Sequence, residues 1–251
     1  MCGVALVLPK IGKVRIKQHR AIPEDHVLKS VTISQTPSGK YYASILYEYE
    51  AEMKTAELTK AIGLDFSMPD LFVSSEDEVQ IDKEFLHHYR RSQKKLAKEQ
   101  RIMSHRKKGS NRYNKQRRKI AVLHEKIANQ RKDYLHKVSR QIANAYDIVC
   151  VEDLNMQSMS QALNFGKSVT DNGWGMFLRF LEYKLAAAGK TFIKIDKWYA
   201  SSKTCCVCGY VNKGLTLHDR NWECPECHTF HERDKNAAIN IKTEGLRIAL
   251  A

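Results

Sequence analysis

Alternating apolar and polar residues in the first 55 positions predict a small β region. Three segments carry the alternation that is typical of strands with one buried face: 13–19 (KVRIKQH), 27–35 (VLKSVTISQ) and 40–50 (KYYASILYEYE). TPSGK at 36–40 supplies the proline and glycine of a tight turn between the last two. Three strands can bury only a small core. We therefore expect this region to belong to a larger β domain or to pack against the next part of the chain.

Short, continuously apolar runs further along the chain predict the strands of a buried sheet. They lie at 61–66 (AIGLDF), 147–154 (DIVCVEDL) and 191–196 (TFIKID), with further strand candidates at 71–75 and 78–81. Helical patterns cover 173–188, closed by Gly189, and the segment that starts at Asp234. Strands that alternate with helices indicate an α/β layer fold.

A long helical pattern lies between the first and second of these runs. Its apolar residues recur at helical spacing: Leu123, Ile127, Tyr134, Leu135, Val138 and Ile142. Asp82 can cap its start, and KKGSN at 107–111 interrupts it. We therefore expect two long helices joined by a turn.

These helices carry the basic surplus of the protein. Residues 83–140 hold 20 Lys and Arg against four acids, whereas the remaining chain holds 22 against 24, so the net charge of +14 is concentrated here. A helix pair that is merely solvated intersperses both signs, and the imbalance instead indicates contact with phosphates. The candidate contacts are Lys94, Lys95, Arg101, Arg106, Lys107, Lys108, Arg112, Lys115, Arg117 and Arg118, with Lys203, Lys213 and Arg220 in the cysteine-rich region.

Composition narrows the class of protein. At 251 residues and 43% hydrophobic content the chain can bury a core, which excludes wholesale disorder. The amino terminus lacks the basic region and cleavage site of a secretory signal, and no apolar run reaches the roughly 20 residues of a membrane span. We expect a cytoplasmic protein with no membrane partner; the sequence leaves its oligomeric state open.

Five of the seven cysteines lie within residues 205–227. Cys205/Cys208 and Cys224/Cys227 form two C-x2-C pairs, a spacing that predicts a tetrahedral four-thiolate zinc site. With all four positions filled the metal is structural, and its binding energy folds the loop. Cys206 with Cys208 is an alternative pair, and a substitute ligand is open among His218, His228 and His231.

Three acids end or open the predicted elements of the sheet. Asp65 and Glu152 each close an apolar run, and Asp234 opens the last helix. Acids at the carboxyl ends of strands lie along one edge of an α/β sheet, where they would hold two Mg²⁺ ions that clamp a phosphodiester. Each acid alone is equally explained as a solvated turn residue or a cap, and on chemistry alone three others are as eligible: Asp153, Asp196 and Glu232.

Four segments together carry a resemblance to a known family. They are 63–70 (GLDFSMPD), 151–159 (VEDLNMQSM), 189–209 (GKTFIKIDKWYASSKTCCVCG) and 222–241 (WECPECHTFHERDKNAAINI). The chain resembles TnpB, the transposon-encoded protein of the OrfB family, over roughly residues 10–245. The resemblance implies an α/β, RuvC-like, RNase H-type nuclease domain with an inserted zinc ribbon, preceded by a partial β (wedge) domain.

The resemblance also implies an activity and its residues. It implies an RNA-guided, Mg²⁺-dependent DNA endonuclease whose partners are DNA and a guide RNA from the transposon end. Catalytic, magnesium-binding roles fall on Asp65, Glu152 and Asp234, and structural zinc falls on Cys205, Cys208, Cys224 and Cys227. The implied domains are the wedge at 1–57, the nuclease at 58–200 with basic helices at 83–145, the zinc ribbon at 201–232 and a final nuclease helix at 233–251.

Two other interpretations stay open. Full members of the family are longer, and this chain is expected to start inside the wedge domain, without the helical recognition insert that grips the heteroduplex. A truncated relic or transposon regulator would therefore bind DNA or RNA through the basic helices and cleave nothing. A strand-transferring transposase also uses RNase H-type acids, but the HERDKNAA context matches the guided-nuclease lineage.

Overall fold

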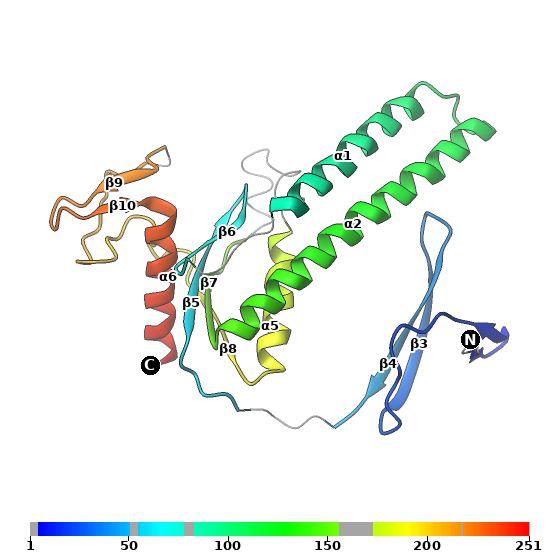
Figure 1. Ribbon diagram of the computed structural model, residues 1–251, viewed down its shortest axis with the longest axis horizontal. Helices are drawn as coiled ribbons and strands as arrows, with labels where there is room; N and C mark the ends of the chain where they lie inside the picture. The colour runs from blue at the N-terminus through cyan, green and yellow to red at the C-terminus, as the bar shows by residue number, and fades with distance from the viewer. Residues whose placement is uncertain (1–4, 51–54, 78–82, 156–172, 217, 251) are drawn as a thin grey trace. The chain divides into compact units, whose positions relative to one another are not determined.

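The structure, a computed structural model, describes residues 5–50, 55–77, 83–155, 173–216 and 218–250 (Figure 1). Side chains are described from residue 88 onward in the first helix. Contacts divide the chain into two units, Met1–Glu52 and Met53–Ala251. The strand expected at 78–81 and the cap expected at Asp82 lie outside the described residues.

The first unit consists of two antiparallel hairpins. Strand β1 (Ala5–Leu8) pairs with β2 (Gly12–Arg15), and β3 (Val27–Gln35) pairs with β4 (Tyr41–Glu48). The predicted turn at 36–40 joins the second pair, with Gly39 at a positive φ of 88°. The structure adds β1, which the sequence pattern did not single out, and most side chains of β3 and β4 are exposed, as expected for a thin core.

The second unit is built on a four-stranded sheet in the order β6-β5-β7-β8. Its strands are β5 (Ala61–Ser67), β6 (Leu71–Ser74), β7 (Ile148–Glu152) and β8 (Thr191–Ile195). The pairs β5–β7 and β7–β8 are parallel, whereas β6 is antiparallel to β5. Strand β7 is buried except at Glu152, as its continuous apolar run predicts. The predicted α/β class is therefore confirmed.

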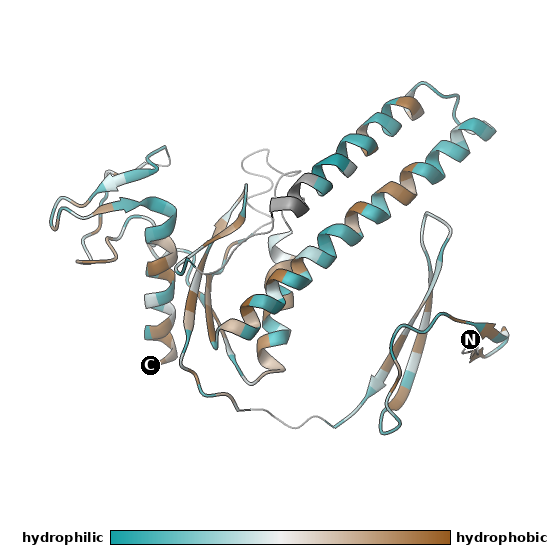
Figure 2. Ribbon diagram, viewed as in Figure 1, coloured by the Kyte–Doolittle hydropathy of each residue, from teal (hydrophilic) through white to brown (hydrophobic). Residues whose placement is uncertain are grey.

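Helices cover both faces of this sheet. On one face α6 (Arg233–Ala249) packs on β5, β7 and β8. On the other, α2 (Asn111–Ala145) and α5 (Trp174–Ala186) bury the larger core, which includes Leu135, Trp174 and Phe177. Figure 2 shows the apolar character of the sheet strands beside the mostly hydrophilic α1 (Lys83–Ser104). Among the helices that the structure describes, none combines the length and apolar character that crossing a membrane requires.

Two glycines let α6 lie close against the sheet. A Cβ on Gly63 of β5 would stand 2.1 Å from the carbonyl oxygen of Ala238, and one on Gly245 of α6 would stand 2.3 Å from Cys150 Sγ. Neither position leaves room for a side chain, because the atoms met include backbone and buried core. These close contacts set the distance between α6 and the sheet. They therefore also position Asp234, at the start of α6, relative to the sheet.

The basic helices α1 and α2 form an antiparallel pair, as predicted, and extend away from the sheet in Figure 1. Ser110 caps α2 by accepting a hydrogen bond from the amide of Tyr113 at 3.1 Å. The six predicted apolar positions of α2 are all buried. Between the helices, the buried Glu99 accepts bonds from Lys119 Nζ at 2.8 Å and Gln116 Nε2 at 2.7 Å. One of the few acids of this segment thus holds the pair together.

Asp147 ties together the starts of three sheet strands. Its Oδ2 accepts hydrogen bonds from the amides of Thr59 at 3.2 Å and Lys60 at 3.0 Å, and its Oδ1 lies 3.1 Å from Lys190 Nζ. Backbone donation by Lys60 is the main cause that lowers the pKa of Asp147 to about 2.

Replacing Asp147 by asparagine is expected to destabilise the fold by about 1–2 kcal/mol at neutral pH. Because the folded pKa of about 2 lies below the ordinary 3.8, this contribution is present above about pH 4 and is lost as the pH falls toward 2. Urea unfolding of wild-type protein and Asp147→Asn at pH 7 and pH 3 measures it. A stability difference of the same size at both pH values would contradict the assignment.

Candidate active site and metal centre

Strand alternation places Asp65 and Glu152 on the side of the sheet that α6 covers. Ala61 of β5 and Cys150 of β7 pack in the core beneath α6. Because side chains at even spacing share a face, Asp65 and Glu152 also face α6. Asp234, the second residue of α6, lies at the end of the helix that approaches them. The structure thus brings together the three acids singled out from the sequence.

The charges of Glu152 and Asp234 both act on Asp65. The pKa of Asp65 is raised well above its ordinary value, first by burial and then by the negative charges of Glu152 and Asp234, while Arg233 opposes the shift. Burial also raises the pKa of Glu152, against a hydrogen bond donated by the Ser201 hydroxyl. Converging, partly buried carboxylates of this kind are most stable when a cation lies between them.

Two arginines engage Asp234. Arg233 Nη2 lies 2.9 Å from its Oδ1, and Arg220 Nη1 lies 3.2 Å from its Oδ2. Arg220, expected from the sequence as a phosphate contact, is therefore paired with a carboxylate in this structure. Its side chain remains 69% exposed, so this guanidinium can leave Asp234 at little cost.

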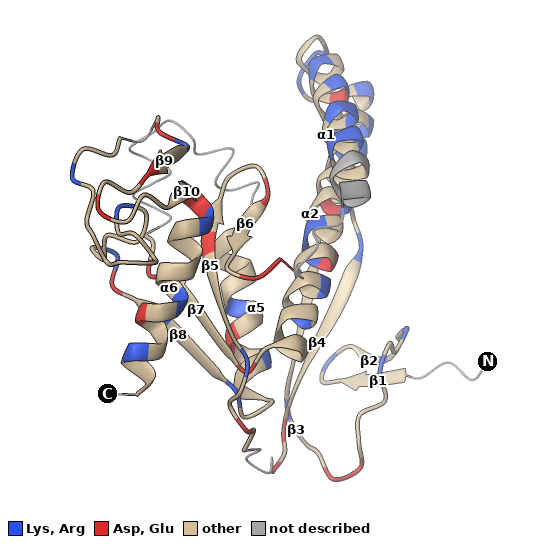
Figure 3. Cartoon of the chain, turned by 60° about the vertical axis from the view of Figure 1, so that its left-hand side comes forward, with Lys and Arg blue, Asp and Glu red and all other residues tan. Residues whose placement is uncertain are grey.

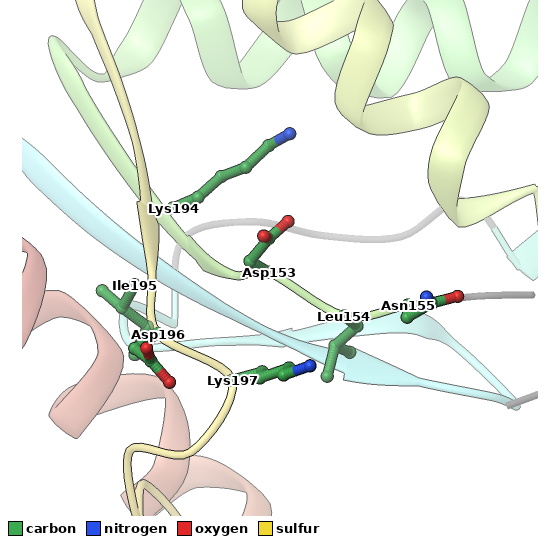
Figure 4. A pocket seen from close by; sticks show the side chains of 7 residues that line it. All are labelled: Asp153, Leu154, Asn155, Lys194, Ile195, Asp196 and Lys197. Atoms are coloured by element: carbon green, nitrogen blue, oxygen red, sulfur yellow. The ribbon is translucent and has the colours of Figure 1, made fainter. Parts of the chain in front are cut away.

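The other acids that the sequence left eligible lie elsewhere. Asp153 and Asp196 line a pocket of about 540 Å³ beside the site, together with Lys194 and Lys197 (Figure 4). In Figure 4 the Asp153 carboxylate lies on the same side as Lys194, and alternation along β8 turns Lys194 away from the α6 face. Glu232 is exposed on β10 (Phe230–Glu232), which pairs antiparallel with β9 (Asn221–Glu223).

The predicted cysteine cluster is present. The sulfur atoms of Cys205, Cys208, Cys224 and Cys227 all lie within 4.8 Å of one another. Each pair sits on a tight turn: the amide of Gly209 donates to the carbonyl of Cys205 at 2.9 Å, and Gly209 has a φ of 79°. Among the described residues, this is the group whose ligand atoms already stand close enough to hold a metal ion, whereas the three carboxylates do not form such a closed group.

Cys206 and the nearby histidines lie outside this cluster. The Cys206 amide instead donates to Asn236 Oδ1 at 3.0 Å, so the alternative pairing of Cys206 with Cys208 is not adopted. The buried His231 lies beside the cluster, with its Nε2 3.1 Å from Cys205 Sγ. His218 and His228 are exposed.

Hydrogen bonds that the sequence pattern did not single out join the cysteine loop to the acids. Asn236 Nδ2 donates to the carbonyl of Thr204 at 2.7 Å, and Asn240 Nδ2 donates to that of Ser201 at 2.8 Å. Both asparagines are buried on α6, one turn apart. Because Ser201 also donates to Glu152, the loop, α6 and the acids form one connected unit. The spacing of Asn236 and Asn240 on a largely apolar helix face was the available signal.

The predicted nucleic-acid contacts are almost all exposed. Figure 3 shows Lys and Arg gathered along α1 and α2. Arg106, in the turn between the two helices, is the exception, because it is half-buried and its Nη1 donates to the carbonyl of Arg112 at 2.6 Å. Lys203 is exposed on the cysteine loop and lines a second pocket of about 350 Å³ with Arg233.

Two protein families match parts of the chain. The OrfB_IS605 family, described as "Probable transposase", matches residues 44–163, and the Cas12f1-like TNB domain matches residues 174–241. The second match contains the four-cysteine cluster and Asp234.

Named relatives are similar over most of the chain. A "Putative RNA-guided DNA endonuclease" of Streptomyces pristinaespiralis is 35% identical over 92% of the chain and 56% of its own length. The "Putative RNA-guided DNA endonuclease InsQ" of Escherichia coli K12 is 32% identical over 96% of the chain and 62% of its own length. The chain thus spans little more than half the length of these relatives.

Among solved structures, the fold is similar to one titled "Cryo-EM structure of CRISPR-Cas12f Ternary Complex". The TM-score is 0.54 at 21% identity, over 84% of this chain and 44% of that chain. The likeness supports the fold described above.

Proposed function

Because the chain belongs to the OrfB (TnpB) family, we propose that it is an RNA-guided DNA endonuclease that hydrolyses phosphodiesters with divalent metal. The observation that carries the proposal is the placement of Asp65, Glu152 and Asp234 on one side of the sheet, where burial and the charges of the other two acids raise the pKa of Asp65. The sheet order, with β6 antiparallel on an otherwise parallel set, supports a RuvC-like nuclease unit. The two hairpins of the first unit would correspond to a partial wedge domain.

The donor set fits magnesium. Carboxylate oxygens are the hard ligands that Mg²⁺ takes in proteins, and three carboxylates face the same side of the sheet here. Asp65 and Asp234 would hold the metal, with Glu152 as a further ligand or bridge. Bound Mg²⁺ supplies charge stabilisation and an activated water for phosphodiester hydrolysis. Ser201 orients the Glu152 carboxylate, while Arg233 and Arg220 hold Asp234 and offer positive charge to a phosphate.

The cysteine cluster fits zinc. Four thiolates at mutual contact distance leave no open position for water or substrate, so the ion would be structural. By folding the loop, it would hold Ser201 against Glu152 and lead β10 (Phe230–Glu232) into the start of α6. Zinc would thereby organise the acidic site without taking part in its chemistry.

The helices α1 and α2 would bind nucleic-acid backbones. Their exposed lysines and arginines present positive charge along the pair, and the acid Glu99 is turned inward. Neutralising phosphates releases counterions, so such binding weakens steeply as salt rises. The partners would be DNA and a guide RNA.

Removing exposed charges from the turn end of these helices is expected to lower the salt dependence of binding. The triple variant Lys107→Ala, Lys108→Ala, Lys115→Ala should reduce the slope of log K against log [salt] by up to about 3 on duplex DNA, about 0.9 per lost phosphate contact. Fluorescence anisotropy from about 50 to 300 mM salt measures the slope. The matched triple Lys→Arg variant keeps the charges and should keep the slope; equal slopes in all three proteins would refute phosphate contact at these positions.

The proposed function is tested by incubating DNA with the wild-type chain and its co-purifying RNA, in Mg²⁺ and in EDTA. We expect cleavage in the Mg²⁺ sample and none in the EDTA sample, because the carboxylates need a bound cation to act on a phosphodiester. Binding without cleavage in either condition would leave a nucleic-acid-binding protein.

A further inference from the structure

Trp198 is exposed in a way that the other tryptophans are not. The chain has three tryptophans; Trp174 and Trp222 are 1% and 6% exposed, whereas Trp198 is 82% exposed. An indole in solvent contributes none of the free energy that burying its large apolar surface would give. Its exposure therefore calls for a partner outside the folded unit.

The loop that carries Trp198 is anchored at both ends to Glu152. On one side Ile195, the last residue of β8, pairs with Glu152 in the sheet. On the other side the Ser201 hydroxyl donates to Glu152 Oε1. Three residues of chain span at most about 11 Å, so the backbone of Trp198 lies within that distance of Ile195, next to the acidic site.

Hydrogen bonds inside the loop hold Trp198 outward. The amide of Trp198 donates to Asp196 Oδ1 at 2.7 Å, and the amide of Tyr199 donates to the carbonyl of Asp196 at 3.1 Å. The Tyr199 ring packs instead in the core beneath α6. The turn thus packs the partly buried Tyr199 ring against the core and leaves the Trp198 ring exposed to solvent.

Lysines and acids both lie near the indole: Lys194 and Lys197 line the adjacent pocket together with Asp153 and Asp196. Lys197 Nζ lies 5.1 Å from the centroid of the Trp198 ring, within the range of a cation–π contact. Lys194 and Lys197 are exposed along the adjacent pocket, and Lys203 is exposed a few residues further along. An exposed aromatic face with a lysine over its ring suits a polyanion whose bases stack, because the ring takes the base and the ammonium takes the phosphate.

We propose that Trp198, with Lys197, is a stacking platform that binds a base of single-stranded nucleic acid at the entrance to the acidic site. This inference rests on the proposed function, because the platform would hold the strand on which the carboxylates act. The platform accepts bases of any identity, since every base has a π face. It would hold an unwound strand and reject the stacked bases of a duplex.

Intrinsic fluorescence tests the platform directly. Oligo(dT), oligo(U) and a DNA duplex are titrated into the full chain without Mg²⁺, with anisotropy of labelled oligonucleotide as the measure of binding. We expect the single strands to quench tryptophan emission and the duplex to leave it nearly unchanged. Trp198→Phe should abolish the quenching, whereas Trp222→Phe, the same substitution at a buried indole, should retain it.

The affinity gives a second readout. Trp198→Ala is expected to weaken binding of a short oligo(dT) by about 5- to 100-fold, and Trp198→Phe, which keeps a ring, by much less. The relative quenching by oligo(dT) and oligo(U) tells which strand, DNA or RNA, uses the platform. Binding without quenching, quenching that survives in Trp198→Phe, or equal quenching by duplex would each overturn the proposal. Quenching by single strands together with no cleavage in the Mg²⁺ assay would contradict the proposed nuclease function but still support the stacking platform.

Discussion

Replacing Cys224 by serine is expected to remove the bound zinc and unfold the cysteine loop. Cys224 is fully buried in the cluster, with its Sγ 3.5 Å from that of Cys208, so its loss leaves three thiolates around the ion. Structural zinc contributes on the order of 10 kcal/mol to the folding of such a loop. Metal content should fall from about one zinc per chain to near zero. Amides of residues 204–231 should then lose protection from hydrogen exchange.

Cys206→Ser is the matched control, because Cys206 lies in the same knuckle but outside the cluster. This variant should keep its zinc and its exchange protection. Treating the wild-type protein with a strong chelator should reproduce the Cys224→Ser result. Equal loss of zinc from Cys206→Ser and Cys224→Ser would contradict the ligand set.

Replacing Asp65 by asparagine is expected to lower the rate of DNA cleavage by about a thousandfold or more. The variant removes one carboxylate that we propose holds the metal, and charge stabilisation by a metal is worth several kcal/mol in the transition state, at a factor of ten per roughly 1.36 kcal/mol. Binding to nucleic acid should change little, because it depends on the distant charges of α1 and α2. Cleavage rate and dissociation constant measured on one substrate separate the two effects.

Asp153→Asn is the control for that experiment. Asp153 follows Glu152 directly but lines the separate pocket, so its loss should leave cleavage nearly intact. Equal loss of binding and cleavage in Asp65→Asn would argue against a purely catalytic role for Asp65. Equal loss of cleavage in both variants would indicate that the catalytic site includes the pocket lined by Asp153.

Much of the architecture could be predicted because local patterns specify it. The run from Ile148 to Val151 is buried on both faces, as a continuously apolar strand should be, and the two C-x2-C pairs form their cluster because each knuckle is a local turn. The basic helices and their turn at 107–111 also follow from periodicity and from the glycine at position 109. In each case the determining residues lie within a few positions of one another.

Other features could not be predicted, because they join residues that are distant in sequence. Asp147 binds the amides of Thr59 and Lys60, and Ser201 binds Glu152, across separations of 49 to 88 residues that no local spacing encodes. The pairing of Arg220 with Asp234 depends likewise on how the cysteine loop folds back. Periodicity alone left Glu152 and its neighbour Asp153 equally eligible, and only the family resemblance favoured Glu152; the structure adds that Glu152 lies on the face of the sheet that α6 covers.

The most direct test of the central claim is a cleavage assay with the purified wild-type chain and the RNA that co-purifies with it. Single- and double-stranded DNA are incubated with Mg²⁺ or with EDTA, and products are followed over time. We predict cleavage that requires Mg²⁺ and stops in EDTA. Tight binding of nucleic acid with no cleavage at any Mg²⁺ concentration would contradict the account and leave a binding protein in place of an enzyme.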